Sequence, residues 1–236
     1  MPTAFVAGAT GFTGREVVRL LAQSGATAIA HVRPDSPSLG HWQERFASMG
    51  ARVDATPWAL GPMTETIRQL DPEWVFCLIG TTRKRGRQAV ETGRPAETYE
   101  SVDYGLTKLL ADATVASGRR PRFVYLSAAG VSARAGGAYG RARWKAEQAV
   151  RASGLPFTIA RPSFIVGAGR DEPRPAELAG ARAIDGLLTV VGAIGLGRVR
   201  DRYRSTTNTV LARALVRLAE DPAARDAIVE SEDLHH

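Results

Sequence analysis

Short apolar runs alternate along this chain with longer segments whose apolar residues recur every three or four positions. The runs typical of buried parallel strands are 4–7, 27–32, 51–55, 74–80, 122–127 and 157–160. The segments with helical periodicity are 16–22, 41–49, 63–70, 97–117, 139–153 and 210–219. This alternation predicts an α/β fold, a doubly wound, mostly parallel Rossmann-like sheet in a single domain spanning 1–236. Residues 166–205 carry proline, glycine and charge with little periodicity, and we interpret them as an insertion that covers the substrate side.

Three glycines stand between the first predicted strand and the first predicted helix. Gly8 permits a tight turn, Gly11 lets the backbone approach a pyrophosphate, and Gly14 lets the helix pack closely on the strand. The free N–H groups and the dipole of the helix favour an anion there. The predicted dinucleotide loop comprises Gly8, Thr10, Gly11, Phe12, Thr13 and Gly14.

The end of the second strand selects between dinucleotides, because it contacts the adenosine ribose. A carboxylate about 20 residues beyond the glycines serves NAD, whereas an arginine favours the 2′-phosphate of NADP. Arg33 is the first charged residue there, with Arg15 as a second candidate cation, so NADP(H) is favoured over NAD(H). Asp35 leaves the NAD alternative open. Asp54 ends the third strand, where it serves either the adenine amino group or an ordinary turn.

Further candidates follow the later strands, since ligands of such sheets bind at the carboxyl ends of the strands. Gly80, Thr81 and Thr82 are expected on the nicotinamide-ribose side, and Pro162 shapes the nicotinamide pocket through backbone groups. The basic run 81–87 either faces phosphates or forms a solvated loop.

Composition narrows the class of protein. The 236 residues are 44% hydrophobic, enough for one sizeable core, and the single cysteine, Cys77, lies in an apolar strand. No run approaches the roughly 20 apolar residues of a membrane span, and we expect a cytoplasmic protein without a metal site. The net charge of +7 comes mostly from dispersed arginines without interleaved aromatics, which argues against nucleic acid as a partner. An apolar segment at 184–196 leaves peripheral membrane contact open.

Several of these motifs together resemble a known family. In chain order they are Gly8–Arg15, Cys77–Arg83, Val124–Gly130, Tyr139 and Arg161–Gly167. The set resembles an atypical short-chain dehydrogenase/reductase and is most similar to the Tat-interacting oxidoreductase-like group, from residue 3 to about residue 220. The resemblance implies NADP(H) binding, with a small-molecule substrate and a monomer or homodimer.

The resemblance also implies catalytic roles. In the reductive families a serine polarises the substrate carbonyl, a tyrosine donates a proton, and a lysine four residues on favours the phenolate. Ser127 and Tyr139 match the first two positions, but Arg143 stands at the lysine position. The structural alternatives are that Ser127 caps the fifth strand and that Tyr139 is an aromatic residue packed at a helix start. Arginine keeps the positive charge on the same helix face but cannot deprotonate. The expectation is an NADP(H)-dependent reductase of a carbonyl or related compound; the alternative is a non-catalytic NADP(H)-binding regulatory or assembly protein.

Overall fold

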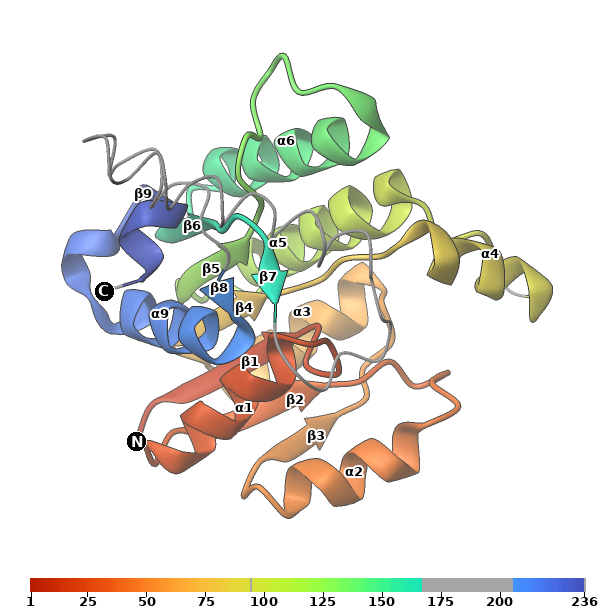
Figure 1. Cartoon of the computed structure of the whole chain (residues 1–236). Helices are drawn as coiled ribbons and strands as arrows, with labels where there is room; N and C mark the ends of the chain where they lie inside the picture. Colours follow the sequence, from red (N-terminus) through yellow and green to blue (C-terminus); the bar gives the residue numbers. More distant parts are fainter. Residues whose placement is uncertain (94, 167–205, 236) are drawn as a thin grey trace.

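One parallel sheet organises the chain. The computed structural model describes residues 1–93, 95–166 and 206–235 (Figure 1). Among them, seven strands run in the order β3-β2-β1-β4-β5-β6-β9, and every pairing is parallel. The strands are β1 (Thr3–Ala7), β2 (Thr27–His31), β3 (Arg52–Asp54), β4 (Trp74–Cys77), β5 (Arg122–Leu126), β6 (Phe157–Arg161) and β9 (Ala227–Glu230). The strand order reverses between β1 and β4, so the sheet is doubly wound and the predicted fold class is confirmed.

Helices cover both faces of the sheet (Figure 1). One face carries α1 (Gly14–Gln23), α2 (Leu39–Ala47) and α9 (Asn208–Glu220), and the other carries α3 (Leu60–Leu70), α5 (Thr107–Ala116) and α6 (Gly137–Ala152). Within the described ranges, the remaining elements are the helix α4 (Arg83–Glu91), the π-helix η1 (Tyr99–Leu106), the short strands β7 (Ile165–Val166) and β8 (Thr206–Thr207), and the 3₁₀ turns η2 (Pro222–Ala224) and η3 (Ser231–Leu234).

The apolar strands are buried on both faces, as a parallel sheet between helices requires. In β1, Phe5 packs among the side chains of α3 and α5, while Val6 faces α1 and α9, and both are fully buried. Cys77 is fully buried in β4, and burial raises the pKa of its thiol to about 11. Cys77 is therefore a core residue and not a nucleophile at neutral pH.

The prediction of a single long α-helix over 97–117 is wrong for the first half of that segment. A π-helix, η1, occupies Tyr99–Leu106 and passes directly into α5. It begins at a reciprocal cap in which Ser101 N–H donates to Thr98 Oγ1 and Thr98 N–H donates to Ser101 Oγ, both at 3.0 Å. The wider turn changes which residues face inward, and Asp103 is fully buried. Val115, an apolar residue of α5, is 46% exposed.

The sequence left two interpretations of the basic run 81–87 after β4: a phosphate-facing segment or a solvated loop. Arg83–Glu91 form α4, so the solvated-loop interpretation is wrong for these residues. This helix projects from the body of the molecule on the side away from α9 (Figure 1). The strand β9 was not predicted, and almost all of the proposed insertion 166–205 lies outside the described residues, as does the apolar segment 184–196.

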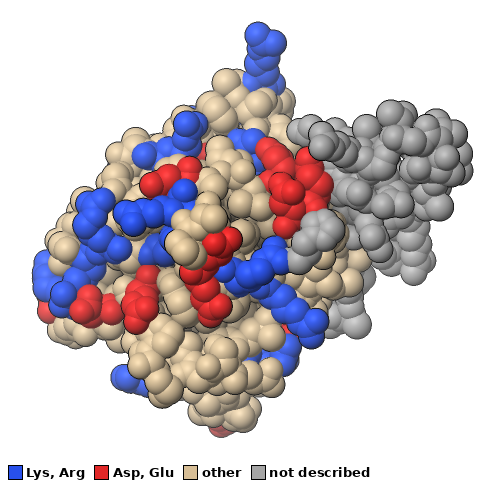
Figure 2. All heavy atoms as spheres, turned by 90° about the vertical axis from the view of Figure 1, so that its left-hand side faces the viewer, with Lys and Arg blue, Asp and Glu red and all other residues tan. Residues whose placement is uncertain are grey.

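The charge of the surface is mixed. On the face shown in Figure 2, basic and acidic side chains lie side by side over the described residues. Ion pairs among the described residues include Arg19 with Glu16 and Arg68 with Glu65. In the described part of the chain, no helix combines the length and apolar character needed to cross a membrane. The absence of a nucleic-acid partner stays a prediction.

Candidate cofactor and catalytic site

The glycine loop between β1 and α1 leaves no space for side chains at its turns. Gly8 has a φ of +83°, and the Gly11 N–H donates to the Gly8 carbonyl at 3.0 Å. A Cβ on Gly14 would lie 2.1 Å from the same carbonyl oxygen. Asn208, at the start of α9, donates to the Phe12 carbonyl at 3.4 Å and ties the loop to that helix. The loop thus has the close approach that a pyrophosphate site requires, and its residues fit a dinucleotide.

Replacing Gly14 with alanine should weaken dinucleotide binding by about tenfold or more, the equivalent of one lost charge-assisted hydrogen bond. The Gly8 carbonyl would have to move away from the new Cβ, and the loop would move with it. Titration of NADPH by nicotinamide fluorescence measures the effect. Gly40→Ala is the matched control, since a Cβ there meets nothing within 4 Å. Unchanged NADPH affinity in Gly14→Ala would contradict this account of the loop.

Arg33 lies just beyond β2 and is bonded to a residue far away in the sequence. Its Nη1 donates to Glu97 Oε1 at 2.9 Å, and its Nε lies 3.5 Å from Asp35. Thr81 Oγ1 donates to the other carboxylate oxygen of Glu97 at 3.1 Å. Glu97 therefore connects the carboxyl ends of β2 and β4. Arg15 lies over the ring of Trp42, with 5.9 Å from its Cζ to the ring centroid.

Asp54 adopts the turn geometry that the sequence left as an alternative. Its carboxylate accepts from the backbone N–H of Thr56 at 3.1 Å and from the Thr56 hydroxyl at 3.0 Å. His31 Nε2 lies 2.8 Å from the Thr56 carbonyl oxygen, and burial lowers the pKa of His31. The carboxylate of Asp54 thus holds the turn beside the end of β2, and an adenine contact stays a prediction.

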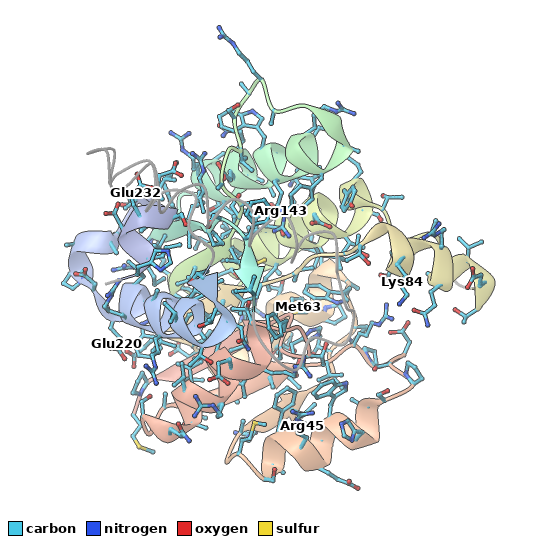
Figure 3. All side chains as sticks on the ribbon, in the orientation of Figure 1. Arg45, Met63, Lys84, Arg143, Glu220 and Glu232 are labelled. Carbon is cyan, nitrogen blue, oxygen red and sulfur yellow. The ribbon has the colours of Figure 1, made fainter. Side chains whose placement is uncertain are left out.

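Arg143 on α6 lies in a buried charged cluster at the carboxyl ends of β4 and β5. Its Nη2 is 3.0 Å from Asp103 Oδ1, and its Nη1 donates to the Leu126 carbonyl at 2.8 Å and to the Tyr125 hydroxyl at 3.2 Å. Asp103 also accepts from the Thr81 N–H at 3.0 Å. Figure 3 shows Arg143 pointing from α6 toward the centre of the molecule.

In this cluster, burial and the neighbouring charges shift the pKa values in opposite directions. Burial raises the pKa of Asp103, against the attraction of Arg143, and burial also raises the pKa of Tyr125. For Arg143, burial lowers the pKa, but Tyr125, Tyr139 and Asp103 together raise it further, so the guanidinium stays charged. Gly80 makes room for this cation, because a Cβ there would lie 2.6 Å from Arg143 Nη2.

Tyr139 lies above Arg143, one helical turn earlier on α6. The distance from Arg143 Cζ to the centroid of the Tyr139 ring is 5.4 Å, which confirms that the two side chains share a helix face. Tyr139 is 40% exposed, and its ring contacts Tyr99 edge-on at a centroid distance of 5.3 Å. An accessible phenol therefore lies directly over a buried cation. Lys145 lies elsewhere, paired with Glu100 at 2.6 Å.

Ser127 follows β5 and is buried. Its hydroxyl donates to Glu147 Oε1 at 2.6 Å, and Glu147 is also bonded at 2.9 and 2.6 Å to the guanidinium of Arg161. Arg161 donates in addition to Glu230 at 2.9 Å, and its bond to Glu147 raises the pKa of Arg161. The single proton of the Ser127 hydroxyl is thus held by Glu147. Near it, the buried Pro162 accepts from the Ala129 N–H at 2.8 Å through its carbonyl.

Three acidic residues of this region were not predicted from the sequence. Glu97, Asp103 and Glu147 contact Arg33, Arg143 and Arg161 respectively. Glu147 carries a local signal, since it lies one turn after Arg143 on the same helix face. Glu97 carries none, because its partner is 64 positions away. In the described ranges, no group of three or more His, Cys, Asp or Glu side chains is placed to hold a metal ion.

The parallel sheet and the glycine loop at its switch point define an NAD(P)-binding protein with a Rossmann-like fold. A family model described as NAD(P)H-binding matches residues 8–182. This chain belongs to that NAD(P)H-binding family, and the resemblance to the atypical short-chain dehydrogenases/reductases is confirmed.

Two curated fungal proteins are similar to the chain along most of its length. Protein fmp52, mitochondrial, of Aspergillus clavatus is 31% identical over 214 residues, 89% of this chain and 83% of the fungal one. Its namesake in Aspergillus niger is 29% identical over 215 residues, with the same coverage of both chains. The word mitochondrial belongs to those proteins, and a cytoplasmic location of this chain stays a prediction.

Solved structures share the fold at low sequence identity. A putative NAD-dependent epimerase/dehydratase from Bacillus halodurans has a TM-score of 0.69 at 13% identity, covering 100% of this chain and 99% of that one. A putative epimerase from Burkholderia cenocepacia has a TM-score of 0.68 at 19% sequence identity, and the match covers 99% of this chain and 78% of that one. The Bordetella bronchiseptica enzyme WbmH, in complex with NAD+, has a TM-score of 0.63 at 16% sequence identity, and the match covers 93% of this chain and 72% of that one.

Proposed function

We propose that this protein is an NADP(H)-dependent reductase that acts on a small carbonyl compound. The observation that carries the proposal is the accessible Tyr139 phenol above the buried Arg143 cation, at the sheet edge where the glycine loop also lies. The NAD(P)H-binding family supports the cofactor class. Parallel fluorescence titrations with NADPH and NADH, followed by a carbonyl screen monitored by NADPH oxidation, test it. Failure to bind either dinucleotide would overturn it.

In this proposal each residue of the site has a separate role in the reduction. Bound NADPH supplies the hydride for the carbonyl carbon. Tyr139 donates its phenolic proton to the carbonyl oxygen, so that an alcohol results, and Arg143 stabilises the phenolate left behind. Arg143 acts through Tyr139 and is a positioning residue. Thr81 and Thr82 follow the end of β4 and would hold the nicotinamide ribose.

Ser127 has a more restricted role than polarising the substrate carbonyl. Because its proton is held by Glu147 at 2.6 Å, the hydroxyl presents lone pairs to a substrate. It orients a substrate oxygen that carries a proton, such as the alcohol product. Donation to a carbonyl requires the bond to Glu147 to break first.

The preference for NADP(H) rests on Arg33, which follows β2, and on Arg15, which lies in the first turn of α1. Arg33 pairs with Glu97 and lies near Asp35. A 2′-phosphate that reaches Arg33 replaces a carboxylate in that contact. Glu97 therefore opposes NADPH more than NADH, because the phosphate adds negative charge beside it.

Replacing Glu97 with glutamine should strengthen NADPH binding by about threefold to tenfold and leave NADH binding nearly unchanged. The amide removes the charge that competes for Arg33, while its size still suits the Thr81 contact. Glu100→Gln is the matched control, since Glu100 pairs with Lys145 instead. Equal shifts in NADPH and NADH affinity, or the same shift in Glu100→Gln, would contradict the assignment of Arg33 to the phosphate.

A non-catalytic NADP(H)-binding protein is a second candidate, favoured by the Ser127–Glu147 bond and by the contacts that hold Arg143. Both groups are engaged inside the protein rather than directed to a substrate. This candidate predicts that bound NADPH persists for hours with varied carbonyl compounds present. Substrate-dependent NADPH oxidation that Tyr139→Phe abolishes would dismiss it.

A further inference from the structure

A cavity of about 990 Å³ lies beside Tyr139, although Tyr139 itself is not among the residues that line it. It begins at Thr81 and Thr82 and runs between α4, the segment that leads into η1, and the first half of α6. Tyr99 and Ala138 line it, and both adjoin Tyr139, one through its ring contact and the other through the chain. Its volume is at the upper end of the range for small-molecule sites.

Most of the wall is apolar. Val90 on α4, Ala96, Tyr99 and Ala138 contribute to it. Val90 is 57% exposed, although its neighbour Ala89 is fully buried, so this α4 side chain remains available to a ligand. An apolar wall favours the apolar part of a ligand, at about 25 cal/mol for each Å² removed from water.

The charges around the cavity are unevenly paired. Glu97 is bonded to Arg33 and Glu100 to Lys145, so these carboxylates are compensated. Arg87 on α4 and Arg141 on α6 also line the cavity, and neither makes an ion pair or hydrogen bond with any residue that the structure describes. Glu91 supplies one opposing charge. Two guanidinium groups from different elements thus have donors left for an anion.

We propose that the substrate of the site is a carbonyl compound with an apolar body and an anionic head group. The apolar body lies along Val90 and Tyr99, the head group is bound by Arg87 and Arg141, and the carbonyl end lies at Tyr139. The assignment of the carbonyl end rests on the proposed function, whereas the assignment of the cavity to an apolar anion is tested separately.

The test is isothermal titration calorimetry with octanoate and octanamide, which share the apolar chain and differ in charge. Octanoate should bind about tenfold more tightly, the gain expected from a charge-assisted hydrogen bond. Arg87→Gln and Arg141→Gln should each reduce this advantage, and Arg151→Gln, at the exposed end of α6, should not. Val90→Asn, at an exposed position, should weaken both compounds equally.

Equal binding of octanoate and octanamide overturns the proposal, as does the absence of binding by both. An octanoate advantage that Arg151→Gln lowers as much as Arg141→Gln also overturns it, because the effect would then be general attraction by the basic protein. Octyl phosphate, compared with octanoate, identifies the preferred anion, and a preference for either supports an anionic head group. NADPH oxidation with 8-oxooctanoate and octanal tests the reductase itself, so the two failures remain distinct.

Discussion

Replacing Arg143 with methionine should lower the free energy of unfolding by about 3–5 kcal/mol. The change leaves the fully buried Asp103 carboxylate without its countercharge, and it leaves the Leu126 carbonyl and Tyr125 hydroxyl without their donor. Urea denaturation followed by circular dichroism measures the loss.

Two further variants make this result specific. Lys108→Met removes an exposed pair with Asp112 and should cost less than about 1 kcal/mol. The double variant Arg143→Met with Asp103→Leu should recover part of the stability, since no unpaired charge is then buried. A loss in Arg143→Met as small as that in Lys108→Met would show that water reaches this cluster.

Replacing Tyr139 with phenylalanine should lower kcat for carbonyl reduction by about 10²–10⁴-fold, the usual contribution of a positioned acid. Phenylalanine keeps the ring that contacts Tyr99 and Arg143, and the position is 40% exposed. The free energy of unfolding and the affinity for NADPH should therefore stay close to those of the wild type. Absorbance at the NADPH band, with the best carbonyl from the screen, measures the rate.

Tyr104→Phe is the matched control for that experiment. Its ring lies near the ammonium of Lys145, at 5.5 Å, and it takes no part in the proposed chemistry. Turnover that survives in Tyr139→Phe would place the proton donor elsewhere. A loss of NADPH binding alongside turnover would show instead that Tyr139 helps to hold the cofactor.

Local patterns were sufficient for every strand of the sheet except β9, and for the glycine loop. An apolar strand, a Gly-rich turn and an amphipathic helix are close together in the chain, and each follows from neighbouring residues. The same holds for the shared helix face of Tyr139 and Arg143, which needs only helical spacing.

The carboxylates that hold the site could not be predicted in this way. Glu97 bonds to Arg33 because two strand ends meet at one edge of the sheet, and no local pattern encodes that meeting. Asp103 faces inward because η1 has π-helical turns, whereas the apolar periodicity of the segment indicated an ordinary α-helix. The basic run in α4 was ambiguous because its strong charge obscures the helical pattern.

The π-helical form of η1 has a consequence for how this family can change in length. Deleting one residue before Asp103 would convert the π-helical turn of η1 into an α-helical turn. Because successive residues of an α-helix are separated by about 100° around the axis, the Asp103 carboxylate would then rotate away from Arg143. An insertion would rotate it the other way. Relatives that retain the Asp103–Arg143 ion pair should therefore conserve the number of residues between Thr98 and Thr107 even where the residues themselves differ.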